Sequence, residues 1–175
     1  KRSKSLMSTT ENLDNKIKEF WPKSGPEIQE IKKYVKKYLK EKIVIKCGGR
    51  ILLDPELFNN FINDITILKK LGLTPIVVHG GGPRIKKKLE KLNIKTKFIM
   101  GLRVTDKKII KVVEEVMTDF NKEIVYALQK KECKAKSIMV SENNAIYVEQ
   151  KNIELGYVGK PTKIDNKLIN NLIEE

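Results

Sequence analysis

Two short glycine runs are the residues of this sequence best suited to chemistry, because each follows a β-branched segment. Gly48-Gly49 comes after residues 42–46, and the run Gly80 to Gly82 comes after residues 75–79. Glycines let backbone N–H groups approach an anion closely, and a helix beginning at Pro83 adds its positive end. The pattern predicts a cradle for phosphate or carboxylate, with a plain tight turn as the alternative.

Two established phosphate signatures are missing from the sequence. It contains neither G-x-x-x-x-G-K-[ST] nor the dinucleotide fingerprint G-x-G-x-x-G. This absence argues against a P-loop enzyme and against a simple dinucleotide-dependent dehydrogenase.

Two cations are candidates for binding an anion. Lys46 ends the first β-branched segment, directly before the glycines. Phosphoryl transfer needs such a point charge, because its catalysis is mostly positioning and charge stabilisation; a solvated lysine, one of 32, is the alternative. Arg103 is one of only four arginines, and its guanidinium fork suits bidentate recognition of a carboxylate or phosphate.

The other reactive residue types form no constellation. His79 is the only histidine, so no Ser/His/Asp or Cys/His set is expected, and a structural role for it is favoured over catalysis. Cys47 and Cys133 lie far apart, which predicts neither a disulfide framework nor a zinc site, and we expect no metal-ligating residues. Cys47 is expected to fill space beneath the glycine loop; a thiol with a lowered pKa is the alternative.

Alternating strands and helices must position these residues. The order is strand 42–46, helix 54–71, strand 75–79 and helix 83–92, with Asp54 as N-cap, Pro55 at the first helical position and Gly72 as the stop. Two such units in succession predict an α/β fold with an open, mainly parallel sheet sandwiched by helices. Ligands bind such a sheet at the carboxyl ends of its strands, where both glycine loops lie.

The second half of the chain is expected to add further elements. We predict a hairpin over 95–104 around Gly101, and then a long helix from Thr105 or Asp106 to about Lys131. Paired strands are expected at 137–140 and 145–149, with a turn at 142–144 between them. An extended stretch then begins at 156–159, and a helix at 166–175 follows.

Two segments precede the first strand. Residues 1–26 are polar without a clear period and predict an irregular or disordered arm. Residues 27–42 hold an N-terminal amphipathic helix whose apolar positions recur at helical spacing. This helix either packs on the core of its own chain or docks on another subunit, and the sequence does not decide between them. Residues 43–175 are predicted to form one domain.

Composition limits the partners. The 175 residues are 40% hydrophobic and 33% charged, with no apolar run long enough for a membrane span or a secretory signal, so a cytoplasmic location and no membrane partner are expected. The net charge of +14 comes mostly from lysine, which favours a solvated lysine-rich surface over a nucleic-acid-binding face. Aromatic residues are only 6%, which argues against single-strand binding.

Four segments together resemble the amino-acid kinase family. They are Lys46 to Gly49, Val78 to Pro83, Gly101 to Asp106 and Gly156 to Gly159, in this order and spacing. The segment Gly-Leu-Arg-Val-Thr-Asp is similar to the acetylglutamate kinase branch, and the resemblance covers about residues 27–175. It implies the family's fold and phosphorylation of the γ-carboxylate of N-acetyl-L-glutamate by ATP with Mg²⁺, the second step of arginine biosynthesis.

The resemblance also implies roles for individual residues. It implies that Lys46 stabilises the transferring phosphoryl group, that Gly48, Gly49 and Gly80 bind phosphate, and that Gly81, Gly82 and Arg103 bind acetylglutamate, Arg103 through the α-carboxylate. It further implies a homo-oligomer, either a dimer or a hexamer joined through the N-terminal helix.

Departures from the family pattern keep other functions open. The chain stops before the family's nucleotide-binding half, so residues 43–175 correspond to the N-terminal, acyl-substrate-binding domain. Arg50, Arg84 and the segment 137–140 differ from what the family usually carries. The alternatives are a non-catalytic acetylglutamate-binding or regulatory module and, less favoured, a basic nucleic-acid-binding domain.

Overall fold

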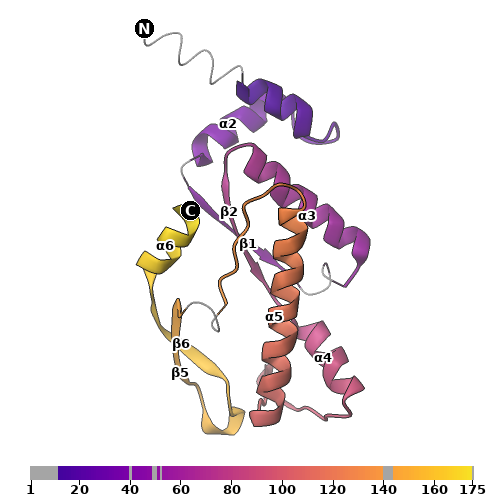
Figure 1. Cartoon of the computed structure of the whole chain (residues 1–175), viewed down its shortest axis with the longest axis vertical. Helices are drawn as coiled ribbons and strands as arrows, with labels where there is room; N and C mark the ends of the chain where they lie inside the picture. The colour runs from indigo at the N-terminus through magenta and orange to yellow at the C-terminus, as the bar shows by residue number, and fades with distance from the viewer. Residues whose placement is uncertain (1–11, 40, 49–50, 52, 140–143, 175) are drawn as a thin grey trace.

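The computed structural model describes residues 12–39, 41–48, 51, 53–139 and 144–174, and its elements alternate between helix and strand (Figure 1). A helix over residues 12–20 comes first. The remaining elements are α2 (Ile28–Tyr38), β1 (Lys42–Cys47), α3 (Pro55–Lys70), β2 (Thr74–His79), α4 (Gly82–Lys91), β3 (Phe98–Ile99), β4 (Leu102–Arg103), α5 (Lys107–Gln129), β5 (Ile146–Gln150), the 3₁₀-helix η1 (Ile153–Leu155), β6 (Gly159–Ile164) and α6 (Asn166–Glu174).

Strands β1 and β2 form a parallel pair, joined by α3 as predicted. Lys46 lies opposite Val78, and Cys47 lies opposite His79, so both glycine loops leave the sheet at the same edge. The crossover helix α3 starts where the sequence indicates, because the Asp54 side chain accepts hydrogen bonds from the backbone N–H groups of Glu56 and Leu57. Gly72 ends it with φ +89°.

One face of this parallel pair is covered by helices. Ile45, Cys47 and Val77 pack with residues of α3 and α5 in the main core cluster. On the opposite face, Val44 is 66% exposed and Val78 is 48% exposed. The expected sandwich of a mainly parallel sheet between two helical layers is therefore only partly right: the described residues form one parallel pair and two antiparallel pairs, with α3 and α5 on one face of the parallel pair.

Helix α4 packs along α5, and a small hairpin connects them. Ile85 and Leu89 of α4 are buried with Ile109 and Val112 of α5. The hairpin pairs β3 with β4 through Met100 and Gly101, whose φ angles are +48° and +77°. Positive φ at both central residues is typical of the tight hairpin turns that match strand twist, so the predicted hairpin is confirmed. Asp106 caps α5 as predicted, accepting from the N–H groups of Lys108 and Ile109.

The pairing of the later strands differs from the prediction. β5 pairs antiparallel with β6, whereas residues 137–139 form no strand and residues 140–143 lie outside the described residues. The reversal occurs at η1 and at Gly156, with φ +67°. No local sequence signal predicts this chain reversal, because it depends on the close approach of Gly156 to Thr105: a Cβ on Gly156 would collide with the Thr105 carbonyl oxygen.

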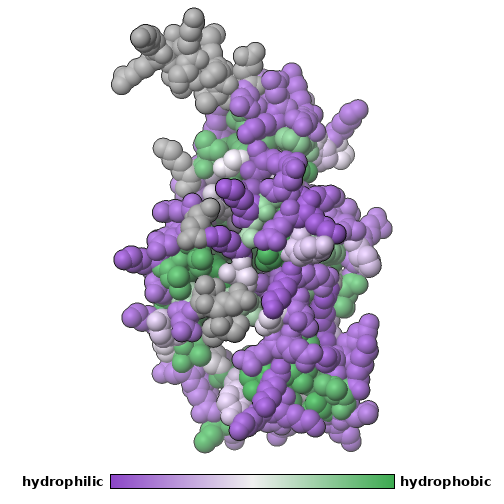
Figure 2. Space-filling view, viewed as in Figure 1, coloured by the Kyte–Doolittle hydropathy of each residue, from purple (hydrophilic) through white to green (hydrophobic). Residues whose placement is uncertain are grey.

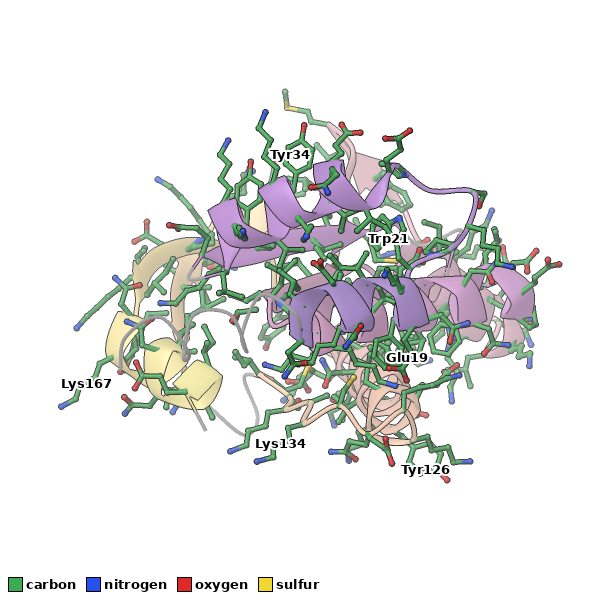
Figure 3. The ribbon with its side chains drawn as sticks, turned by 90° about the horizontal axis from the view of Figure 1, so that it is seen from above. Glu19, Trp21, Tyr34, Tyr126, Lys134 and Lys167 are labelled. Atoms are coloured by element: carbon green, nitrogen blue, oxygen red, sulfur yellow. The ribbon has the colours of Figure 1, made fainter. Side chains whose placement is uncertain are left out.

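An N-terminal layer of two helices, residues 12–20 and α2, packs on the end of α3 (Figure 3). Ile17 is fully buried with Ile31 and Val35 of α2 and with Leu71. Within residues 1–26 the structure therefore has a helix where an irregular arm was expected, while residues 1–11 lie outside the described residues. Ile31 and Val35 of α2 are buried within their own chain, as the first of the two expectations for this helix requires, while Tyr34 is 48% exposed.

Hydrophilic side chains cover most of the face seen in Figure 2, and several apolar patches interrupt them, one of which lies near the end where α5 begins. Within the residues that the structure describes, no helix combines the length and apolar character that crossing a bilayer would need.

Candidate phosphate and substrate site

The two glycine loops meet at the carboxyl edge of the β1–β2 pair. The backbone N–H of Gly80 donates to the carbonyl of Cys47 across this edge, at 3.4 Å. A Cβ placed on Gly48, Gly80 or Gly82 would meet no atom within 4 Å. These glycines therefore border open space rather than a packed interior, which is the arrangement that a cradle for an anion requires. Gly49, another predicted loop glycine, lies outside the described residues, as does Arg50.

Lys46 lies at this edge on the uncovered face of the sheet. Its side chain is exposed, and it has no ion-pair partner among the described residues. Its register partner Val78 is apolar. The ammonium group therefore lies exposed at the edge where the loops leave the sheet, with no described carboxylate bound to it.

The N-terminus of α4 opens into the same place. Gly81 is its N-cap and gives no side-chain capping bond, and the first turn holds no acidic residue. No side chain of the cap or first turn therefore neutralises the positive N-terminal end of α4, and this end can attract an external anion. A Cβ on Gly81 would collide with the Met117 side chain, so the loop lies directly against α5 at this point.

His79 does not have the surroundings of a general base. Its Nε2 lies 3.2 Å from Asn121 Nδ2, and its ring meets the Phe120 ring edge-on, with centroids 5.0 Å apart. Burial lowers the pKa of His79, the backbone of Gly80 opposes this, and the nearby Arg84 charge lowers the pKa further. The ring is therefore neutral at pH 7 and packed between elements, in keeping with the expected structural role. Burial raises the pKa of the Cys47 thiol, which agrees with the predicted space-filling role.

Arg84, which departs from the family pattern, is bound to α5. Its Nη1 lies 2.5 Å from Glu123 Oε2 and its Nη2 lies 3.1 Å from Glu123 Oε1, so the pair is bidentate. Its Cζ lies 3.9 Å from the centroid of the Phe120 ring. Because Glu123 neutralises this charge locally, Arg84 is a structural cation at the start of α4.

Arg103 lies on the separate β3–β4 hairpin. Its Nη1 donates to Thr96 Oγ1 at 2.9 Å, and its Cζ lies 4.7 Å from the Phe98 ring centroid. Within the described part of the chain, no hydrogen bond joins Arg103 to the Gly80–Gly82 loop. The structure thus places Lys46, Gly48 and the Gly80–Gly82 loop at one edge of the sheet. Arg103 lies on the β3–β4 hairpin instead, where it contacts Thr96 and Phe98.

Sequence reasoning missed the residues of α5 that contact this edge. They are Met117, Phe120, Asn121 and Glu123. Their helical spacing predicts a shared face, but nothing local shows that this face meets the glycine loop. Only the tertiary packing of α5 on β2 and α4 places them there.

Phosphate groups fit this edge better than a bare metal ion does. Open glycine backbone, an ammonium group with no ion-pair partner among the described residues and a helix N-terminus without a side-chain cap suit phosphate groups. Among residues 12–39, 41–48, 51, 53–139 and 144–174, no group of three or more His, Cys, Asp or Glu side chains is placed to hold a metal ion.

Residues 41–175 match the sequence profile of the amino acid kinase family. Curated relatives include an acetylglutamate kinase of Pelagibacter ubique, 56% identical over 153 residues, and one of Petrotoga mobilis, 42% identical over 145 residues. These alignments cover 87% and 81% of this chain but 53% and 48% of the relatives. The chain therefore spans about half the length of the curated relatives it matches.

Solved structures share the fold. The structure of smu.665 from Streptococcus mutans aligns with a TM-score of 0.68 at 27% identity, covering 76% of this chain and 54% of that one. An N-acetylglutamate synthase from Neisseria gonorrhoeae, complexed with coenzyme A and N-acetyl-glutamate, aligns with a TM-score of 0.66 at 17% identity. It covers 85% of this chain and 36% of the other, and at that identity the likeness concerns the fold alone.

Proposed function

Because this chain belongs to the amino acid kinase family, we propose that it is the acyl-substrate-binding portion of an acetylglutamate kinase. In the proposed reaction, a γ-carboxylate oxygen of N-acetyl-L-glutamate forms a bond to the γ-phosphorus of ATP. The bond from that phosphorus to the β–γ bridging oxygen breaks, which gives an acyl phosphate and ADP. The 56% identity to the Pelagibacter enzyme over most of this chain is the observation that carries the proposal.

We propose that the edge formed by the two loops is where phosphate and the reacting carboxylate meet. Lys46 stabilises the charge on the transferring phosphoryl group, and Gly48 and Gly49 donate N–H groups to phosphate oxygens. Gly80, whose N–H donates to the Cys47 carbonyl, lines the phosphate site by leaving open space beside its backbone. The open space beside Gly48 and Gly80 and the exposed Lys46 ammonium support these roles.

The acyl substrate is assigned to neighbouring residues. We propose that Gly81 and Gly82, at the N-terminus of α4, contact acetylglutamate and that Arg103 binds its α-carboxylate. The fork of Arg103 matches two carboxylate oxygens, and its Thr96 and Phe98 contacts already restrict its rotamers. Binding there requires the β3–β4 hairpin to present Arg103 toward the loops.

The wider setting is proposed on the same basis. Mg²⁺ enters with the phosphates of ATP, since this ion is usually held by few protein carboxylates together with substrate phosphates. We propose a cytoplasmic enzyme that forms a homo-oligomer. We also propose that residues 43–175 form one domain and that residues 27–42 are the N-terminal helix attached to it.

The test uses the natural protein that contains this chain. Purified protein is incubated with ATP, Mg²⁺ and N-acetyl-L-glutamate, and ADP and acyl phosphate are quantified, with glutamate and aspartate as competing acceptors. Turnover that requires the N-acetyl compound supports the proposal. Tight binding of N-acetylglutamate without ADP formation would instead favour a non-catalytic binding module, and turnover of another acceptor would reassign the substrate.

A further inference from the structure

We propose that α5 is the positioning element of the Gly80–Gly82 loop, through two side-chain pairs that meet at Phe120. One pair, His79 with Asn121, fixes the strand end that enters the loop. The other, Arg84 with Glu123, fixes the helix that leaves it. The loop is thus held at both ends by a helix that contributes none of the residues assigned to binding.

The entering end is fixed by two contacts of the His79 ring. The Asn121 amide lies at its Nε2 and the Phe120 ring meets it nearly perpendicularly, at 78°. His79 directly precedes Gly80. A ring held at its tip and at one side allows little rotation of the strand end, so the direction in which Gly80 leaves β2 is restricted.

The leaving end is fixed by Arg84, the third residue of α4. Its guanidinium lies over Phe120 while both of its terminal nitrogens bind Glu123. A lysine cannot reproduce this arrangement, because stacking on an aromatic ring and bidentate binding both need the planar fork. An arginine at this position in a chain of 32 lysines and four arginines is what such a requirement predicts.

The middle of the loop is supported by a third contact. Gly81 lies so close to the Met117 side chain that a Cβ there would collide with it. Met117 precedes Phe120 by three residues, so the helix presents one continuous face to all three parts of the loop. That face supports the loop from one side, next to the open space that an added Cβ on Gly80 or Gly82 would enter.

A second ion pair on the same two helices provides a matched control. Lys88 Nζ lies 2.6 Å from Glu115 Oε1, joining α4 to α5 four residues beyond Arg84. Both pairs cross between α4 and α5, but only the Arg84 pair lies in the first turn beside the loop. If each pair only attaches α4 to α5, removing either pair should change the loop equally. If the Arg84 pair positions the loop, only its removal should change the loop.

The experiment measures hydrogen exchange by NMR, in the natural protein that contains this chain, at the amide of Gly80, which donates to the Cys47 carbonyl, and at the amide of Ile85, which donates to the Gly81 carbonyl. We expect Arg84→Met to speed exchange at these amides by about tenfold, while Lys88→Met leaves them unchanged. Arg84→Lys, which keeps the charge, should give most of the same effect. The exchanged pair Arg84→Glu with Glu123→Arg should recover part of the protection.

Equal exchange in Arg84→Met, Arg84→Lys and Lys88→Met would overturn the positioning role. If Arg84→Met does not fold, the comparison of Arg84→Lys with Lys88→Met decides the question. The ligand of the loop rests on the proposed function, but loop exchange is measured without any ligand. In the natural protein, Arg84→Met should lower kcat more than it raises the KM for N-acetyl-L-glutamate. An inactive natural protein with the predicted exchange pattern would refute the proposed function and leave this inference standing.

Discussion

At the scale of single residues, the charge of Lys46 decides whether the glycine edge performs chemistry or only binds. Lys46→Ala should lower turnover of the natural protein by about 10²–10³-fold, because the lost ammonium group acts mainly on charge that develops in the transition state. Its effect on the Kd of N-acetyl-L-glutamate should be small. Steady-state kinetics together with calorimetry separate the two quantities.

Lys42→Ala is the control for this prediction. Lys42 lies on the same strand and the same face of the sheet, and it hydrogen-bonds Asn170 of α6 instead of facing the loops. Near-normal turnover in Lys46→Ala, or an equal loss in Lys42→Ala, would contradict the role given to Lys46.

Arg103 tests the geometry of carboxylate recognition. Arg103→Lys should raise the Kd of N-acetyl-L-glutamate by about 10- to 100-fold, which corresponds to one charged hydrogen bond, because a single ammonium cannot reproduce the fork. Calorimetric titration of the natural protein gives the Kd. Lys97→Arg, on the same hairpin, should leave it unchanged, and an unaltered Kd in Arg103→Lys would exclude the assignment.

His79 makes stability depend on pH. In the folded protein, burial lowers the pKa of the His79 imidazole below its ordinary value of 6.5. The same imidazole therefore binds a proton more readily in the unfolded chain. The free energy of unfolding therefore rises with pH, and this contribution is complete above about pH 6.5 and is lost on acidification through the folded-state pKa. Urea unfolding between about pH 5 and 7 should show the slope in the native chain and lose it in His79→Gln. An equal slope in both proteins would assign the effect to other groups.

At the scale of elements, local signals were sufficient where one short stretch determines the geometry. Asp54 and Asp106 cap their helices because each carboxylate reaches N–H groups two and three residues ahead. The hairpin turn at Gly101 was likewise predicted. The prediction of a strand over 137–140 was wrong for the described residues 137–139. The turn at Gly156 brings β6 beside β5, so β5 pairs with β6 instead.

Gly156 and Gly101 make a matched pair for testing this turn. Both have positive φ, but only Gly156 lies against backbone, at the carbonyl oxygen of Thr105. Gly156→Ala should destabilise the chain by about 2–4 kcal/mol, from backbone strain and the collision together, against about 1 kcal/mol for Gly101→Ala. Urea denaturation followed by circular dichroism measures both. Similar losses would show that the Thr105 contact can relax.

At the scale of the whole molecule, the helical order and the parallel pair of strands followed from sequence periodicity, and the resemblance to a family followed from four short motifs. The short helix over 12–20 was missed, because Leu13, Ile17 and Phe20 give only one or two turns of apolar spacing within a polar stretch. The α5 contacts of the loop were also missed. Both depend on which surfaces meet, and periodicity within one segment does not show that.

The N-terminal layer should contribute to the stability of the whole chain. Ile17 is fully buried between α2 and the end of α3, so Ile17→Ala should cost about 2–4 kcal/mol through lost burial and the cavity left behind. Lys16→Ala, on the exposed side of the same helix, should cost less than about 0.5 kcal/mol. Urea denaturation followed by circular dichroism compares them. A small loss in Ile17→Ala would mean that this layer opens before the rest of the protein unfolds.

Trp21, the only tryptophan of the chain, follows the helix over 12–20 and contacts the N-terminal cluster (Figure 3). Its indole lies against Gly25, and its Nε1 atom is buried. Intrinsic fluorescence excited at the indole band is therefore a natural optical reporter of this layer alone. Without any added label, this fluorescence would show in real time whether the two N-terminal helices stay packed on α3 of their own chain or leave it to pack on a neighbouring molecule.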